Sequence, residues 1–258
     1  MNTLVFDIET VPDVALGRRL HGLQGLEDAQ VAKAMFGLRR QATGNDFLAH
    51  EQQRIIAISC LLRSREDLRL WSLGSPGAPE AELIERFFDG IERFAPDLVS
   101  WNGGGFDLPV LHYRGLLAGV QAPRYWETGD GDSAFRYNNY LGRYHRRHTD
   151  LMDVLSAYQS RARVSLANMA CLLGLPGKMG FSGAQVWEAC QAGDFEAIRR
   201  YCETDVLNTY LIYLRFELMR GRFTRERYGE EVERVKGLLR ISREPHLAQF
   251  LAAWESAV

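Results

Sequence analysis

The chain has 258 residues, of which 46% are hydrophobic and 25% are charged, and its formal net charge at pH 7 is −2. This composition is ordinary for a globular protein, and the length lies at the upper end of what one α/β domain occupies, so we expect a single domain over residues 1–258. The charge excludes a protein coated in basic surface, although a local basic groove around an acidic site is compatible with nucleic-acid binding.

Neither a membrane protein nor a disulfide-rich protein is expected. An acidic pair directly follows the first short apolar run, a pattern that no signal peptide or membrane helix tolerates, and no other apolar stretch approaches ~20 residues. The four cysteines are scattered without a C-x-x-C pair, which disfavours a zinc site: Cys60, Cys171, Cys190 and Cys202. We therefore expect a cytoplasmic protein with reduced thiols and no membrane partner.

The first quarter of the chain predicts strands separated by a helical insert. Residues 3–6 are typical of a short buried strand, whereas residues 13–53 show no strand pattern and predict loosely amphipathic helices. Residues 54–62 are strongly strand-like, and residues 68–73 predict a hairpin partner for that strand.

A helix and a strand are predicted next. Residues 79–95 lie between Pro79 and Pro96 and carry apolar residues at helical spacing on one face: Leu83, Ile84, Phe87, Phe88, Ile91 and Phe94. A strand at 98–101 follows, and the glycines at 103–105 predict a tight turn.

The second half of the chain is predicted to be mainly helical. A helix is expected to begin near Asp107, and short helices fit residues 151–158 and 165–173. Asp194 is a suitable cap for a long helix that ends at about residue 220. Residues 222–258 predict a helical C-terminal extension.

Asp7 and Glu9 interrupt a strand that should be apolar throughout if it lies inside an α/β sheet. The two-residue period of a strand puts both side chains on one face. Two buried like charges cost several kcal/mol unless a positive charge compensates them, and a divalent cation would supply that charge. The alternative is that the strand ends at Phe6 and that Asp7 begins a solvated turn before Pro12.

Asp107 ends an N-x-x-x-F-D pattern that begins at Asn102 and includes Phe106. It follows a predicted strand, and ligands of open α/β sheets gather beyond the carboxyl ends of strands. The alternative is a structural role, because an Asp ahead of Leu-Pro is a good helix N-cap.

Tyr201 and Asp205 are four residues apart and therefore share one face of the predicted long helix. That face also carries mainly apolar residues, so it is expected to point at the core: Ile198, Cys202, Thr209, Ile212 and Phe216. The alternative for Asp205 is a buried carboxylate bonded to an arginine or to a backbone group.

Taken together, the four carboxylates suit a site for two divalent ions. Such ions, roughly 3.5–4 Å apart, activate a water and stabilise the leaving oxygen during phosphodiester cleavage. A tyrosine near the attacking water can orient it and share its proton.

The sequence resembles the DEDD superfamily of 3′→5′ exonucleases, and more closely the stand-alone group related to the proofreading domain of family-B DNA polymerases. Three motifs carry the resemblance in the family order: Phe6-Asp7-Ile8-Glu9-Thr10, Asn102 through Phe106-Asp107, and Tyr201-Cys202-Glu203-Thr204-Asp205. The match spans roughly residues 3–215. Any one motif is weak, whereas the ordered triple is specific.

The resemblance implies an α/β fold with a ribonuclease H-like mixed β-sheet flanked by helices. It implies that four carboxylates bind two Mg²⁺ or Mn²⁺ ions: Asp7, Glu9, Asp107 and Asp205. Tyr201 would position the nucleophilic water. A tyrosine at this place, with no histidine in residues 149–245, indicates the tyrosine branch (DEDDy) of the superfamily.

The chain departs from a proofreading domain in two ways. The helical insert at about 13–53 is longer than in a minimal domain, and no polymerase palm or fingers follow the motifs within the 258 residues. We therefore expect an enzyme that acts alone or is recruited by partners that the sequence does not identify.

Contacts to substrate are expected from five residues: Thr10, Asn102, Phe106, Arg143 and Arg146. Arg143 and Arg146 belong to a segment, residues 136–148, that interleaves aromatic residues with cations, a combination that stacks on unpaired bases and follows phosphates. The alternative for this segment is a solvated edge hairpin. Lys178 and Asp150 are expected at the surface, Asp150 at a helix start, and Trp101 in the core.

The sequence therefore predicts a two-metal-ion 3′→5′ exonuclease that acts on the 3′ ends of single-stranded nucleic acid and releases 5′-mononucleotides. DNA is favoured over RNA, although the sequence does not separate the two, because discrimination depends on contacts to the 2′-hydroxyl. The alternatives are an exoribonuclease that trims RNA 3′ ends and a catalytically silent nucleic-acid-binding adaptor.

Overall fold

A five-stranded sheet forms the centre of the computed structural model, which describes residues 2–256. The strands are β1 (Thr3–Pro12), β2 (Gln53–Arg63), β3 (Leu68–Ser72), β4 (Asp97–Ser100) and β5 (His148–Asp150), in the order β3-β2-β1-β4-β5. β2 pairs antiparallel with β1 and β3, whereas β1, β4 and β5 run parallel. The predicted hairpin and the mixed α/β sheet are confirmed.

Strand β1 is central and continues through both acidic residues. It pairs with β2 from Thr3 to Pro12, with Asp7 opposite Ser59, and a bulge follows Glu9. Backbone pairing to β2 keeps the chain extended beyond Phe6, so the alternative in which the strand ends there is wrong. The bulge shifts the register after the two carboxylates, as bulges beside functional sites often do.

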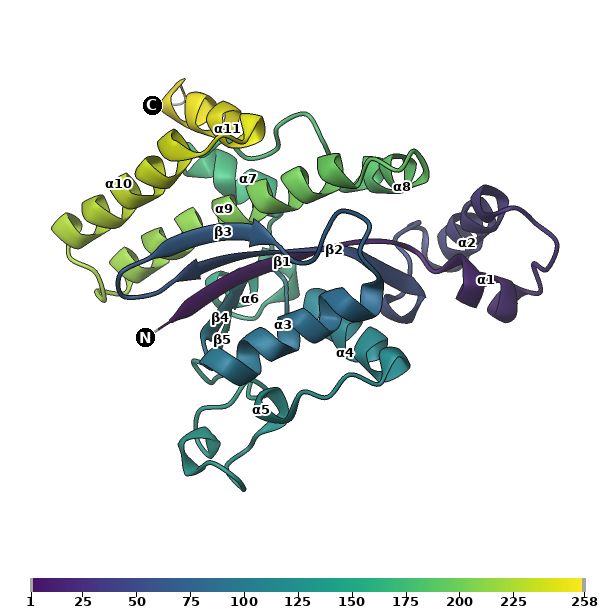
Figure 1. Cartoon of the computed structure of the whole chain (residues 1–258), viewed down its shortest axis with the longest axis horizontal. Coiled ribbons are helices and arrows are strands. Elements are labelled where there is room, and N and C mark those ends of the chain that lie inside the picture. Colours follow the sequence, from purple (N-terminus) through teal and green to yellow (C-terminus); the bar gives the residue numbers. More distant parts are fainter. Residues whose placement is uncertain (1, 257–258) are drawn as a thin grey trace.

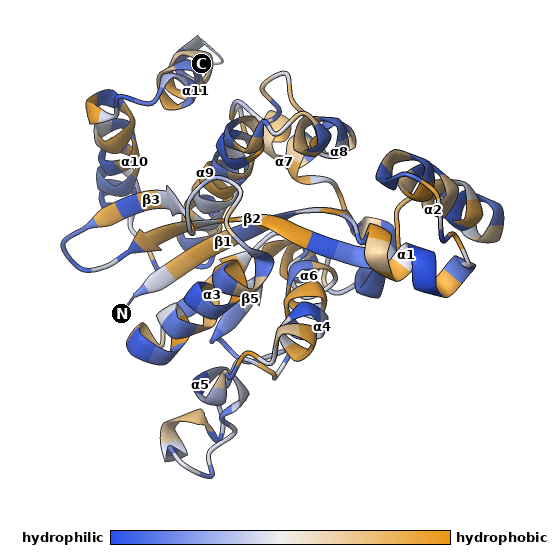
Figure 2. Ribbon diagram, turned by 45° about the vertical axis from the view of Figure 1, so that its right-hand side comes forward, coloured by the Kyte–Doolittle hydropathy of each residue, from blue (hydrophilic) through white to orange (hydrophobic). Residues whose placement is uncertain are grey.

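Helices cover both faces of the sheet (Figure 1). One layer holds α3 (Glu80–Phe94), α4 (Asp107–Ala118) and α5 (Pro123–Trp126), and the other is built around α9 (Phe195–Met219) and α10 (Arg225–Ile241). Hydrophobic residues run along β2 between the two layers (Figure 2). This arrangement buries both sides of the central strands, as expected for an α/β sheet.

Successive residues of β1 face opposite layers. Leu4, Phe6 and Ile8 belong to the apolar cluster around α3, whereas Val5 belongs to the cluster around α9. Residues at odd positions of the strand therefore face α9, because the side-chain period is two. This parity directs the side chains of Asp7 and Glu9 toward α9.

The segment 13–53 is helical, as predicted. It contains α1 (Val14–His21) and α2 (Asp28–Thr43), which lie at the end of the sheet beyond the last residues of β1 (Figure 1). Gly17 allows the two helices to pack closely, because a Cβ at this position would lie 2.3 Å from the Met35 sulfur. A single turn at His50–Gln52 then leads into β2.

The remaining helices are α6 (Leu151–Leu155), α7 (Leu166–Leu172), α8 (Gly183–Gln191) and α11 (Pro245–Ser256). Asp194 caps α9 as predicted, since its carboxylate accepts a hydrogen bond from Ala197 N at 3.1 Å. The C-terminal extension is helical, as predicted.

Three expectations are corrected by the structure. Helix α8 was not predicted, because its sequence has too few apolar residues to show a helical pattern. In the structure, Val186 is its buried residue and packs against the sheet. Helix α6 ends three residues earlier than predicted, and Phe94 lies 48% exposed at the end of α3 rather than on its buried face. Within residues 2–256, no helix is long and apolar enough to span a membrane.

Candidate active site

Asp7 and Glu9 form the centre of the site. Glu9 is buried, whereas Asp7 keeps partial contact with solvent although it lies deep in the fold. One ligating atom from each carboxylate and the Cys202 sulfur all lie within 4.8 Å of one another. The predicted placement of both carboxylates on one face of the strand is observed.

Asp107 is the first residue of α4, but it does not cap the helix. Phe106 occupies the N-cap position, and the Asp107 carboxylate instead accepts a hydrogen bond from Ile8 N at 3.2 Å. Its side chain is 3% exposed. The alternative of a helix cap is therefore wrong, and the bond joins α4 to the strand between the two acidic residues.

Helix α9 brings the third part of the site across the sheet. Tyr201 and Asp205 share one helical face, and the charge of Asp205 acts on both Asp7 and Glu9. The Tyr201 hydroxyl interacts with the Asp205 carboxylate and partly offsets the rise in its pKa that burial causes. The predicted convergence of four carboxylates and one tyrosine is thus present in the structure.

Cys202 is a contact that the sequence did not indicate. Its thiol donates to the Asp7 backbone carbonyl at 3.4 Å and to Asp7 Oδ2 at 3.6 Å. Burial and the neighbouring charge of Asp7 raise the pKa of this thiol well above its usual range. Cys202 therefore keeps its proton and serves as a donor to Asp7 rather than as a thiolate ligand. The signal was its place between Tyr201 and Asp205 in the third motif.

Burial and mutual repulsion make the carboxylates hard to ionise together. Burial, then the charges of Asp107 and Glu9, raises the pKa of Asp7 well above its usual range, and burial and Asp205 do the same for Glu9. Burial raises the pKa of Asp107 to about 7 and that of Asp205 to about 6. A cluster that resists ionisation in this way favours an added cation.

The donor atoms fit a hard divalent cation. Aspartate and glutamate supply only oxygen, which Mg²⁺ and Mn²⁺ prefer, and the neighbouring thiol stays protonated. The positive charge of Lys178 partly offsets the raised pKa values of Glu9 and Asp205, so this exposed lysine lies at the edge of the site. Lys178 is exposed at the surface, as expected, and the structure places it beside the carboxylates.

Asp150 fixes the loop that leads to Asp107. Its two oxygens accept hydrogen bonds from Asn102 N and Gly104 N, each at 2.9 Å, and burial raises its pKa. Asn102 adopts the left-handed conformation, with φ of 66°. Asp150 begins α6 as predicted, but it is buried and holds the glycine turn, which the sequence did not indicate.

A groove of about 1010 Å³ opens beside the carboxylates. Glu9, Thr10 and Phe106 lie in its floor, and α2 and α8 supply its sides. Thr10 donates its hydroxyl hydrogen to Gln53 Oε1 at 2.9 Å, so the side chain is fixed in position. Two of the residues expected to contact substrate, Thr10 and Phe106, therefore line one groove.

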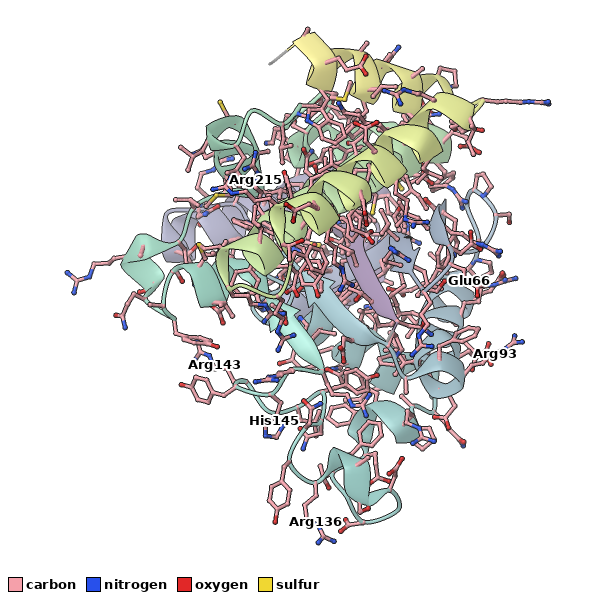
Figure 3. The ribbon with its side chains drawn as sticks, turned by 90° about the vertical axis from the view of Figure 1, so that its left-hand side faces the viewer. Glu66, Arg93, Arg136, Arg143, His145 and Arg215 are labelled. Carbon is pink, nitrogen blue, oxygen red and sulfur yellow. The ribbon has the colours of Figure 1, made fainter. Side chains whose placement is uncertain are left out.

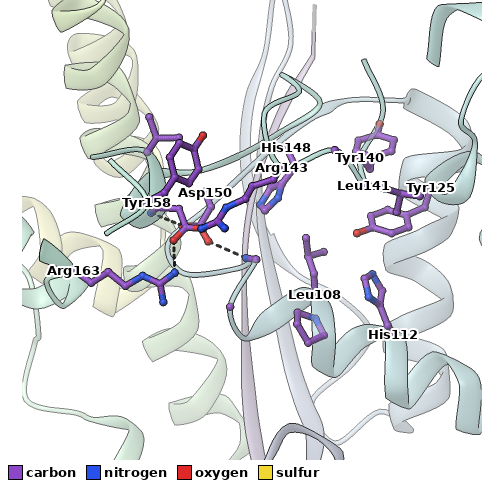
Figure 4. A pocket seen from close by; sticks show the side chains of 16 residues that line it. Leu108, His112, Tyr125, Tyr140, Leu141, Arg143, His148, Asp150, Tyr158 and Arg163 are labelled. Carbon is purple, nitrogen blue, oxygen red and sulfur yellow. Dashed lines mark hydrogen bonds and ion pairs between the residues drawn. The ribbon is translucent and has the colours of Figure 1, made fainter. Parts of the chain in front are cut away.

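Arg143 lies in a second cavity, of about 450 Å³, on the other side of the glycine turn (Figure 4). It pairs with Asp153 at 3.2 Å and stacks over Tyr158. Arg146 is exposed and does not line either cavity. Substrate contacts from Asn102, Arg143 and Arg146 stay predictions.

The segment 136–148 is not an edge hairpin, because within it only His148 belongs to a strand. Arg136 projects outward from this segment (Figure 3). The side chain of Arg147 instead lies over the Phe135 ring, 4.0 Å from its centroid. Trp101 is buried, as predicted.

The fold is that of a polymerase-associated exonuclease. A structural match covers 85% of this chain and 24% of a family B DNA polymerase from the archaeon Pyrobaculum calidifontis, with a TM-score of 0.50 and 18% sequence identity. The chain therefore spans about a quarter of the length of that polymerase. The ribonuclease H-like α/β fold expected from the motifs is confirmed.

The sequence family agrees with the fold. Residues 45–254 match the family described as a predicted 3′-5′ exonuclease related to the exonuclease domain of PolB, and the chain belongs to this family. Asp107, Tyr201 and Asp205 lie within the match, whereas Asp7 and Glu9 precede it. No curated protein sequence matches the chain.

Proposed function

We propose that the protein is a divalent-cation-dependent exonuclease that removes nucleotides from the 3′ end of single-stranded DNA and releases 5′-mononucleotides. The observation that carries the proposal is the convergence of four carboxylates from β1, α4 and α9 on one point, beside Tyr201. Family membership supplies the reaction class, and the relation of the family to a DNA polymerase domain favours DNA.

Two ions suit this cluster better than one. Asp7 and Glu9 present oxygens within 4.8 Å of each other, whereas Asp107 and Asp205 approach from other elements and extend the donor set beyond that tight group. Bound divalent cations would supply a nucleophilic water and would stabilise the leaving oxygen. A pair of ions roughly 3.5–4 Å apart requires such an extended set of oxygens.

The residues of the chain would orient the reactants around this cluster. The Tyr201 hydroxyl, next to Asp205, is placed to hold the attacking water by a hydrogen bond. Burial raises the pKa of Tyr201, so it stays a neutral donor and acceptor at every physiological pH. The positive charge of Lys178 near Glu9 would attract the phosphate of the substrate.

The test is digestion of 5′-labelled DNA and RNA oligonucleotides of one sequence. We expect Mg²⁺ or Mn²⁺ to give a ladder that shortens from the 3′ end of the DNA, and EDTA to stop the reaction until the cation is restored. Faster digestion of the RNA would contradict the assignment of the sugar and favour the exoribonuclease. Binding without digestion of either strand would contradict catalysis and favour the adaptor.

A further inference from the structure

Helix α2 presents a polar and aromatic face to the groove beside the carboxylates. Its groove-lining residues recur at helical spacing: Ala29, Lys33, Phe36, Gly37 and Arg40. The opposite face of the helix is buried, where Val31 and Met35 form a small apolar core with Leu48. The buried face, with Phe36 packed against its edge, holds the helix in place, and Lys33 on the groove side is exposed and available to a ligand.

Phe47 extends this face with an aromatic ring that is 54% exposed. The ring lies 5.2 Å from that of Phe106, and the Phe47 carbonyl accepts a hydrogen bond from Arg39 Nε at 2.9 Å. His50 Nε2 is hydrogen-bonded to the Gly105 carbonyl at 2.8 Å, which ties the segment to the loop before Asp107. Phe47 is thus exposed to solvent but held in place beside the site.

The groove combines cations with aromatic rings. Lys33 and Lys178 have no ion-pair partner among residues 2–256, whereas the charge of Arg40 is matched by Asp46 at 2.7 Å. Four aromatic side chains lie in the same lining: Phe36, Phe47, Phe106 and Trp187. Cations that contact phosphates and rings that stack on bases are the combination that binds single-stranded nucleic acid.

We propose that the segment from Ala29 to Leu48, here called the insert wall, binds unpaired nucleotides of the substrate strand. Phe47 stacks on a base, and Lys33 contacts a phosphate. This inference rests on the proposed exonuclease function, to which it adds the surface that binds the single strand. The whole of α2 lies outside the residues that match the family, since the match begins at residue 45.

The groove is continuous with the carboxylate cluster, which indicates that the substrate strand occupies it. Glu9 and Thr10 form part of the groove floor, so a strand whose end reaches the carboxylates lies along the insert wall. The volume of about 1010 Å³ is at the top of the ~300–1,000 Å³ range of small-molecule pockets and accommodates more than one nucleotide. Bases must be unpaired to stack on Phe47, so a blunt duplex binds less well.

Binding is measured with the Asp7→Asn variant, which is expected to hold the strand without cutting it. A fluorescein-labelled ten-nucleotide DNA strand is titrated by anisotropy in the presence of Mg²⁺. Adding Phe47→Ala should weaken binding about 5- to 100-fold through loss of base stacking, and Phe47→Trp should restore it. Phe94→Ala is the matched control, because Phe94 is similarly exposed, at 48%, and does not line either cavity.

The salt dependence tests Lys33 separately. Replacing Lys33 by Ala should reduce the slope of log Kd against log salt concentration by about 0.7, the value for one phosphate contact on a single strand. Arg93→Ala should leave the slope unchanged, because Arg93 lines neither cavity. Thermal melting of each variant checks that the fold is retained.

The outcomes separate this inference from the proposed function. In the active protein, the Phe47→Ala and Lys33→Ala changes should act mainly on KM for single-stranded DNA. If the wild type digests DNA and both variants behave like the Phe94 and Arg93 controls, the insert wall does not bind the strand, and the proposed exonuclease function is unaffected. If the wild type neither binds nor digests the strand, the proposed function fails and the inference with it.

Discussion

Arg114 Nη1 donates to Asp13 Oδ2 at 2.6 Å, and this buried ion pair joins α4 to the residue that follows β1. The same guanidinium forms a bidentate pair with Glu80 at 2.8 and 2.6 Å. Because β1 carries Asp7 and α4 begins with Asp107, the pair fixes the two acid-bearing elements relative to each other.

Replacing Arg114 by Met should strongly destabilise the protein. The change leaves the buried carboxylate of Asp13 and the half-buried carboxylate of Glu80 without their cation, which typically costs about 3–5 kcal/mol for a buried pair. Urea denaturation measures the loss. The matched control is Arg86→Met, which removes an exposed pair with Glu82 and should cost at most about 1 kcal/mol. Equal effects of the two changes would contradict a role for Arg114 in joining the elements.

Replacing Asp7 by Asn should abolish activity without loss of the fold. We expect kcat to fall at least about 10³-fold, which corresponds to about 4 kcal/mol of transition-state stabilisation. The metal-free variant should melt no lower than the wild type, because one repelling carboxylate of the cluster is gone. Single-turnover digestion and thermal melting provide the two measurements, and wild-type hydrolysis by the variant would overturn the site.

The stability of the metal-free protein should fall as pH rises from about 4 to 7. The folded pKa values of Asp107 and Asp205, about 7 and about 6, lie above the ~4 of an unfolded aspartate. In this window the folded state binds more protons than the unfolded state, so the free energy of unfolding decreases with each unit by which the pH rises. Desolvation lowers the pKa values of the half-buried histidines His112 and His148 to about 4, and these two groups act in the opposite direction.

Comparing the Tm of samples with and without Mg²⁺ isolates the contribution of the carboxylates, because the histidines contribute equally to both samples. A cation competes with protons for the cluster, so the gain in Tm should be larger at pH 8 than at pH 5. At a concentration of 100 Kd, the gain at pH 8 should be roughly 5–10 °C for a protein of this size. An equal gain at both pH values, or no gain, would argue against a cation at this site.

Replacing Tyr201 by Phe should slow catalysis while leaving cation binding intact. Removing the hydroxyl beside Asp205 takes away a hydrogen bond to the attacking water, for which about a 10²-fold loss in kcat is expected. The Mg²⁺-dependent gain in Tm should be unchanged, since the four carboxylates remain. If Mg²⁺ no longer raised the Tm of the variant, Tyr201 would be needed for cation binding by the carboxylates rather than for positioning the water.

Much of the site could be predicted from the sequence. The two-residue period places Asp7 and Glu9 on one face of a strand, and the four-residue spacing places Tyr201 and Asp205 on one face of a helix. These are local relationships that follow from the geometry of one strand or one helix. The ordered motifs then related elements that lie almost 200 residues apart.

Other features depended on packing. Asp107 is a good N-cap by sequence, yet in the structure its carboxylate turns to Ile8 N, because β1 lies beside the start of α4. Asp150 has an ordinary helix-start sequence, but the neighbouring glycine turn gives its oxygens two further donors. In both cases a long-range partner replaces or adds to the local role that a sequence pattern indicates.

The elements that carry the carboxylates could be predicted from local sequence, because the backbone of a strand or helix fixes the period of its side chains. Three further features depend on long-range packing: Lys178 lies near Glu9, Cys202 donates to Asp7, and α2 and Phe47 line a groove at the site. Each of these contacts joins segments far apart in the chain, and their distances are set by how the helices pack on the sheet.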